Sequence, residues 1–139
     1  MATFNKFNAF VEDLAEKVHN LGADALTIAL TAAANAPVAT NSILANLTQI
    51  AYTNLSARVP TISSSLQTAG TYKLILADLV LTASGVAAAF RYIALYNDTP
   101  TSPADPLIGW YDYGADLSLG AGETFTIDFD GTGGVLTLA

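Results

Sequence analysis

The 139-residue chain has no cysteine and only five basic residues. The lack of cysteine excludes disulfides and thiolate metal sites, and it leaves the redox compartment open. The basic residues are scattered along the chain: Lys6, Lys17, Arg58, Lys73 and Arg91. A surface that binds nucleic acid needs clustered basic side chains, which replace the counterions around the phosphates. The scatter and the net charge of −7 therefore predict a protein that does not bind nucleic acid.

Charged residues of either sign are scarce as well. They make up 12% of the chain, against roughly 25% in an average soluble domain. Hydrophobic residues make up 52%, which is the opposite of a disordered composition. The length favours one domain, residues 1–139. So few charges leave apolar groups on the surface, and we expect other chains to cover part of that surface.

Targeting and membrane signals are missing. The first residues lack the basic region and apolar run of a signal peptide. The apolar stretch 72–90 is interrupted by Lys73 and Asp78, unlike a membrane span. We therefore expect a chain that is made in the cytoplasm and does not associate with a membrane.

Catalytic patterns are also absent. A serine-histidine-acid arrangement could be built only through His19, the single histidine, and no Gly-x-Ser-x-Gly motif is present. One histidine without cysteine also argues against a zinc site. We expect a non-enzymatic protein without a catalytic site, metal or cofactor, in which His19 lies on the surface of a helix.

The N-terminal segment 1–22 has helical periodicity. Apolar residues recur every three or four positions, and Gly22 stands where a helix would end; these residues are Phe4, Phe7, Phe10, Val11, Leu14 and Val18. The spacing predicts an amphipathic helix over residues 4–21. Its apolar stripe either covers a sheet or forms an arm that docks onto a neighbouring subunit. The second interpretation makes Phe4, Phe7 and Phe10 candidate interface residues.

The remaining body, residues 23–139, shows alternation and turn signals typical of strands. We expect strands at residues 24–31, 58–66, 72–77, 79–82, 90–96, 107–113, 124–129 and 135–138. Ser42 is positioned to cap one further short helix. Pro60 places the second strand at a sheet edge. The glycines at 131, 133 and 134 predict a hairpin turn. The fold class that follows is mainly β, an antiparallel sandwich or jelly-roll-like fold.

Acidic residues gather in the last third of the chain: Asp112, Asp116, Glu123, Asp128 and Asp130. The segment that starts at Asp128 resembles the beginning of a calcium loop, but it lacks the acid that closes such a loop. The simpler interpretation is that Asp128 faces solvent, opposite the inward Phe125, Ile127 and Phe129, and that Asp130 opens a turn. We therefore expect no metal site at these acidic residues. Calcium binding by the cluster is the alternative interpretation.

Aromatic residues form the last pattern. Strand alternation places Tyr111 and Tyr113 on one face and Trp110 on the other, and it places Tyr92 with Phe90. Such side chains either fill the core or present a platform for a sugar or a protein. Trp110, Tyr111 and Tyr113 are therefore candidate interface residues.

Several phrases in the sequence resemble a family of small tailed-bacteriophage virion proteins. The matching phrases are Phe-Asn-x-Phe-Val-Glu-Asp-Leu-Ala-Glu-Lys-Val-His-Asn-Leu at 7–21, Ala-Pro-Val-Ala-Thr-Asn at 36–41, Phe-Arg-Tyr-x-x-Leu-Tyr-Asn-Asp-Thr at 90–99, Asp-Pro-Leu-Ile-Gly-Trp-Tyr-Asp-Tyr-Gly at 105–114 and Gly-Glu-Thr-Phe-Thr-Ile-Asp-Phe-Asp at 122–130. Apart from the first, which falls in the predicted helix, these are strand-and-turn phrases, and none of them carries a catalytic or ligand-binding motif.

The resemblance implies a capsid decoration or cement protein. Its partner would be the major capsid protein on the exterior of the virion, with a homo-oligomer, preferably a trimer, at the capsid symmetry axes. Its acidity fits the outer shell better than the DNA-facing lumen. The alternative is a tail- or fibre-associated β module that binds host glycan or other tail proteins.

Overall fold

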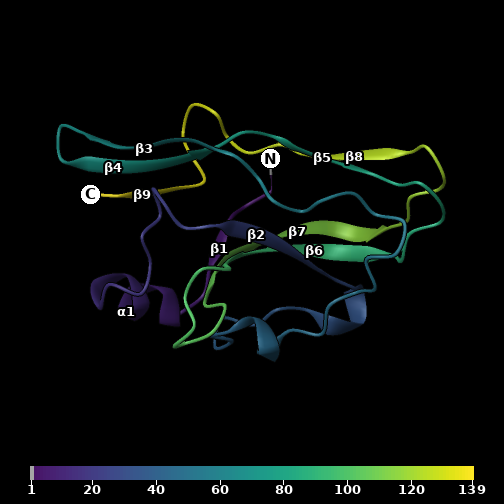
Figure 1. Ribbon diagram of the computed structural model, residues 1–139, viewed down its shortest axis with the longest axis horizontal. Helices are drawn as coiled ribbons and strands as arrows, with labels where there is room; N and C mark the ends of the chain where they lie inside the picture. Colours follow the sequence, from purple (N-terminus) through teal and green to yellow (C-terminus); the bar gives the residue numbers. More distant parts are fainter. Residues whose placement is uncertain (1) are drawn as a thin grey trace.

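The computed structural model describes residues 2–139 and is mainly β, with 42% of residues in strands and 9% in helices (Figure 1). The strands are β1 (Asn5–Lys6), β2 (Leu26–Thr31), β3 (Ile62–Thr68), β4 (Thr71–Leu76), β5 (Leu79–Thr82), β6 (Phe90–Asn97), β7 (Leu107–Leu117), β8 (Thr124–Ile127) and β9 (Leu136–Leu138). The helical elements are α1 (Ala9–Ala15) and two 3₁₀ turns, η1 (Ala33–Asn35) and η2 (Leu44–Asn46).

All strand pairs are antiparallel, and they form three sheets. The largest has the order β1-β7-β6-β2, and the others are β3-β4-β9 and β5-β8. Figure 1 shows the two smaller sheets on the same side of the four-stranded sheet, with β3-β4-β9 at one end and β5-β8 at the other. The two residues Ala77 and Asp78 connect β4 to β5. The Asp78 carboxylate accepts the Phe129 backbone N–H at 3.0 Å, which fastens this junction to the segment after β8.

The main core lies between the four-stranded sheet and the two smaller ones. It joins β2, β6 and β7 to β4, β5 and the end of β8 in one cluster of buried side chains that includes Ile28, Leu95, Leu74, Leu81 and Phe129. The apolar positions that alternate along β2 face this cluster, as period-2 patterning requires. Each fully buried leucine or phenylalanine contributes about 1.5–3 kcal/mol of transfer free energy.

A second cluster covers the other face of the four-stranded sheet. It contains Phe7, Ala29, Ala94, Tyr96 and Leu107. Every residue of β2 is consequently buried, because both faces of this strand are covered.

The N-terminal segment differs from the predicted helix over 4–21. Helix α1 spans only Ala9–Ala15, and residues 5–6 form β1, which pairs with β7. The Phe7 N–H continues this ladder to the Ile108 carbonyl at 3.2 Å. Lys17 has φ 68°, in the left-handed region, and this conformation does not continue a helix. The apolar residues that gave the helical periodicity are therefore buried from two conformations, the strand β1 with the residue after it and the helix α1.

Gly109 permits the pairing of β1 with β7. A Cβ at this position would lie against the Phe4 ring and 2.6 Å from the Asn5 carbonyl oxygen. We predict that Gly109→Ala lowers the free energy of unfolding by about 1–3 kcal/mol, since the added methyl group overpacks this contact. Gly131→Ala is the control, because a methyl group added at that position would meet no atom within 4 Å. Equal stability of the two variants in urea unfolding would contradict this role.

Three other local expectations need correction. The segment at 131–134 is not a hairpin turn, because β8 pairs with β5 and β9 pairs with β4. The helix expected after Ser42 is the single 3₁₀ turn η2. A register shift between Phe90 and Tyr92 separates these two residues, so Phe90 joins the main core and does not share a face with Tyr92. Such a bulge moves the following side chains to the other face.

The expected strand at a sheet edge forms, but over 62–68 in place of the predicted 58–66. β3 lies at the end of the order β3-β4-β9, and Pro60 precedes it by two residues. The predicted 72–77 and 79–82 strands also form, in two different sheets. β4 is only partly buried.

Candidate functional site

The candidate interface residues of the N-terminal segment lie mostly inside the protein. Phe7 is 0% exposed and Phe10 is 3% exposed. Phe4 is half-buried and stacks on Tyr111 with 5.0 Å between ring centroids. These rings fill the chain's own core, so the structure supports the covering interpretation of this segment. Phe7 and Phe10 have no exposed surface to offer to a neighbouring subunit.

The aromatic residues of β7 divide between the two faces of the sheet, as alternation predicted. Trp110 packs on Phe7 with a centroid distance of 4.5 Å, next to the second cluster. Tyr111 faces the main core and approaches Phe129 at 6.3 Å. Tyr113 is half exposed and meets Phe125 edge to face, with centroids 5.3 Å apart. Trp110 and the two tyrosines therefore do not form one platform.

A groove of about 370 Å³ lies where β7 faces the end of β8. Its lining consists of Ala2, Ile93, Tyr111, Tyr113, Phe125, Thr126, Ile127 and Asp128. Burial raises the pKa of the Tyr111 hydroxyl to about 12, with a smaller contribution from Asp130, so this group stays protonated at neutral pH. None of the described residues that line the groove is basic.

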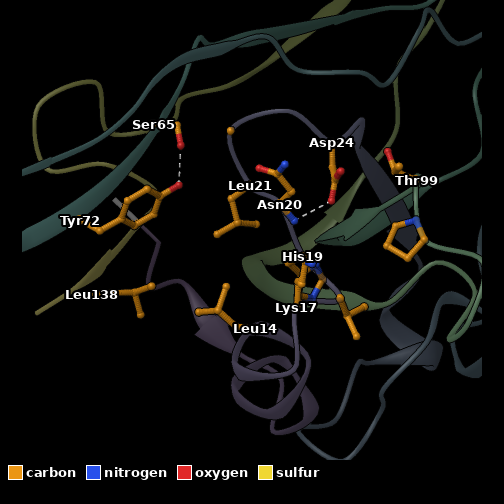
Figure 2. Close-up of a pocket in the computed structure, with 13 residues that line it drawn as sticks. Leu14, Lys17, His19, Asn20, Leu21, Asp24, Ser65, Tyr72, Thr99 and Leu138 are labelled. Atoms are coloured by element: carbon orange, nitrogen blue, oxygen red, sulfur yellow. Dashed lines mark hydrogen bonds between the residues drawn. The ribbon is translucent and has the colours of Figure 1, made fainter.

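A larger cleft of about 730 Å³ lies between α1, the segment that follows it, and the β3-β4-β9 sheet (Figure 2). Figure 2 shows Leu14 and Leu21 facing Tyr72 and Leu138 across this cleft. The Tyr72 hydroxyl is 2.8 Å from the Ser65 hydroxyl at its rim. This lining is mainly apolar, and it also includes His19, Asp24 and Ser65.

His19 borders the cleft but is not on a helix surface. It follows α1 and is 6% exposed, with the Phe10 ring 5.2 Å from its own. The Asn97 amide nitrogen lies 3.1 Å from His19 Nδ1 and 2.6 Å from an Asp24 carboxylate oxygen. The Asn97 amide oxygen accepts the Thr99 N–H at 3.1 Å. The prediction of a surface histidine is therefore wrong.

This network fixes the protonation state of His19. Because the Asn97 amide nitrogen is a donor only, His19 Nδ1 must accept, and the ring proton is on Nε2. Nε2 is buried and has no hydrogen-bond partner within residues 2–139. Burial lowers the pKa of His19, and the nearby Asp24 carboxylate opposes this shift. The structure thus holds His19 as a neutral, buried ring that packs against Phe10.

Four of the five acidic residues of the last third accept hydrogen bonds from named partners. Asp112 forms a two-point salt bridge with Arg91 at 2.8 and 3.0 Å, and this hydrogen bonding, aided by the Gly114 N–H, lowers the pKa of the Asp112 carboxyl. Asp130 accepts the Gly133 and Thr132 N–H groups, which lower the pKa of its carboxyl. The expected turn at Asp130 is confirmed.

The remaining acids are similarly placed. Glu123 accepts the Gly120 N–H at 2.6 Å, and Asp116 accepts the Ala33 N–H at 3.2 Å. Asp128 is exposed while Ile127 and Phe129 are buried, as the alternation predicted. Within the part of the chain that the structure describes, no three histidine, cysteine, aspartate or glutamate side chains gather as a metal site would require.

Three of the five basic side chains also have local partners. Arg58 lies over the Tyr52 ring at 3.6 Å, Arg91 pairs with Asp112, and Lys73 donates to the Thr132 carbonyl at 2.8 Å. Across residues 2–139 no helix is both long and apolar enough to span a membrane.

Comparisons of the chain with protein families, with curated proteins and with solved structures found no match. The likeness to phage virion proteins thus stays a prediction from the sequence.

Proposed function

We propose that this chain is a non-enzymatic structural protein of a tailed-bacteriophage virion, a decoration or cement protein that binds the outer capsid surface. Its partner is the major capsid protein, and it acts as a homo-oligomer, preferably a trimer, at a symmetry axis. Its architecture is an antiparallel sandwich with β3-β4-β9 and β5-β8 as one layer. It is made in the cytoplasm of the bacterial host and assembles on the capsid exterior.

The observation that carries this proposal is that the two most exposed large apolar side chains of residues 2–139 lie in elements at opposite ends of the molecule. Leu66 of β3 is 68% exposed, and Val86, in the connection between β5 and β6, is 79% exposed. The β3-β4 hairpin and the β5-β6 connection lie at opposite ends in Figure 1. A small domain with apolar side chains exposed at two separate ends can contact two neighbouring subunits at once, as a cement protein must.

The charge distribution supports an exterior position. The net charge of −7 and the local pairing of Arg58, Lys73 and Arg91 leave little positive potential for contact with packaged DNA. The division of Trp110 and Tyr113 between opposite faces of β7 removes the single aromatic platform that glycan recognition by a tail module would have used.

Rebinding to particles that lack the protein tests the proposal. We expect saturable binding of the purified protein and an increase in the heat resistance of the particles. Leu66→Asp and Val86→Asp each place a charge in an apolar contact and should weaken binding by about tenfold or more, since an unpaired buried charge costs several kcal/mol. Val11→Asp, on the exposed side of α1, is the matched control. Wild-type protein that neither binds nor protects the particles would refute the cement function.

A further inference from the structure

The strand β8 has one paired edge and one open edge. Its only strand partner among the described residues is β5, in the register Leu81↔Phe125 and Thr82↔Thr124. The open edge runs along the 370 Å³ groove, which Phe125, Thr126, Ile127 and Asp128 line together with Tyr111 and Tyr113 of β7. A groove bordered by an unpaired strand is a site where an extended peptide can add a strand.

The alternation of hydrogen-bonded and non-hydrogen-bonded residue pairs between β5 and β8 shows which backbone groups face this open edge. The Thr82 N–H donates to the Ser56 hydroxyl at 2.8 Å, and its carbonyl accepts the Ser56 N–H at 3.0 Å, so the Thr82 backbone points away from β8. Thr124, opposite Thr82, consequently belongs to a pair that exchanges no hydrogen bonds, and its own N–H and C=O point away from β5. Two residues further along, Thr126 has the same orientation and an exposed side chain.

The groove also has room for a side chain of the added strand. Tyr113 is 51% exposed, and its single ring contact with Phe125, at an interplanar angle of 87°, leaves at least one ring face open. In an added strand, alternate side chains point to the same face as Phe125 and Ile127, towards these rings. Aromatic surfaces of this kind receive apolar anchors of a partner.

The charges at the ends of β8 select the partner. Glu123 precedes the strand and Asp128 follows it, both are exposed, and none of the lining residues among 2–139 is basic. Antiparallel pairing with β8 of a second copy would bring Glu123 of one copy near Asp128 of the other, and such like-charge pairs are unfavourable. A segment with basic residues on either side of an apolar anchor matches these charges instead.

We propose that the open edge of β8 binds an extended segment of a partner protein that carries basic residues around an apolar anchor. The segment pairs with the backbone of Thr124 and Thr126, its anchor lies against Tyr113 and Phe125, and its basic side chains reach Glu123 and Asp128. This inference rests on the proposed function, in which the partner is the major capsid protein.

Particle rebinding with substitutions along β8 tests this site. Thr126→Pro removes one outward N–H but no bond to β5, and proline is tolerated at such an edge position. Thr126→Ala keeps the N–H and is the matched control. We expect Thr126→Pro to weaken particle binding by about tenfold or more, since a lost hydrogen bond and a blocked strand together exceed 1.4 kcal/mol. Thr126→Ala should bind as the wild type does.

A charge reversal tests the site without altering the backbone. Asp128→Lys should weaken binding by about tenfold, whereas Glu12→Lys on α1, which makes the same change in net charge, should have little effect. If the wild-type protein binds the particles and the Thr126→Pro and Thr126→Ala variants bind with equal affinity, the proposed strand addition is wrong. The cement function would not be affected by that result. Equal binding of the two lysine variants would overturn the basic partner. A wild-type protein that fails to bind would refute the cement function itself.

Discussion

Replacing Phe7 by alanine is expected to lower the free energy of unfolding by about 3–5 kcal/mol, the usual cost of deleting a buried aromatic side chain. Phe7 is 0% exposed, stacks on Trp110 at 4.5 Å and packs among the side chains of the second cluster. Its backbone N–H also continues the β1-β7 ladder. Urea unfolding followed by Trp110 fluorescence reports the stability and the loss of this ring contact together.

The matched control is Val11→Ala, four residues further along the same segment. Val11 is 52% exposed on α1, so its truncation should change the free energy of unfolding by less than about 0.5 kcal/mol. The comparison separates the two interpretations of the N-terminal segment. A Phe7→Ala protein as stable as the wild type would mean that this segment is a detachable arm.

Replacing Asn97 by alanine is expected to cost about 3 kcal/mol, because buried polar groups lose their partners. Asn97 is 0% exposed. Its side chain forms hydrogen bonds with the His19 ring, the Asp24 carboxylate and the Thr99 N–H. Asn20→Ala is the control, since that amide is exposed in the same region. Thermal or urea unfolding of both variants measures the difference. Equal stability would show that the network does not hold the segment after β6 against residues 19–25.

The same network makes stability depend on pH. The folded protein lowers the pKa of His19, chiefly by burial, so folding favours the neutral ring. This contribution is fully present above the unfolded pKa, about 6.5, and is lost as the pH falls from there towards the folded pKa. The maximum slope is about 1.4 kcal/mol per pH unit.

His19→Gln isolates this titration. Glutamine can accept from the Asn97 amide through its side-chain oxygen but does not titrate, so the loss of stability below pH 6.5 should be smaller than in the wild type. Asp24, whose charge favours a protonated His19, is unchanged in this comparison. Parallel pH profiles for wild type and variant would contradict the assignment of a neutral, buried His19.

The strands were predictable because alternation and turn residues act locally. Phe90–Asn97, Leu107–Leu117 and Thr124–Ile127 appear close to where their patterns placed them. The pairing of β8 with β5, across more than forty residues, has no local signal, and the glycine-rich turn at 131–134 suggested a hairpin instead. The bulge before Tyr92 likewise depends on the register with β7 and is invisible in a single strand.

The N-terminal segment shows how a correct pattern can yield a wrong structure. Phe4, Phe7 and Phe10 were expected to lie on one apolar face of a helix. All three pack inwards, but Phe7 joins the second cluster, whereas Phe4 and Phe10 pack with the main core. The positions of Phe4 and Phe7 depend on Gly109, more than a hundred residues away, which leaves space for β1. His19 was misplaced for a related reason, since its partner Asn97 is distant in sequence.

The candidate site was only partly predictable. Tyr111 and Tyr113 were singled out as interface residues, and both line the groove beside β8. The open edge itself follows from the sheet order, which the sequence does not encode locally. Alternation along the strand had placed Asp128 on the solvent side, and the same pattern marks Thr126 as exposed. No other local signal pointed to this edge.

Cryo-electron microscopy of particles with and without this chain tests the central claim most directly. We expect added density over the outer capsid lattice, repeated at symmetry axes, with β8 of each copy against an extended segment of a capsid subunit. Density confined to the tail, or identical capsids in the two samples, would contradict it.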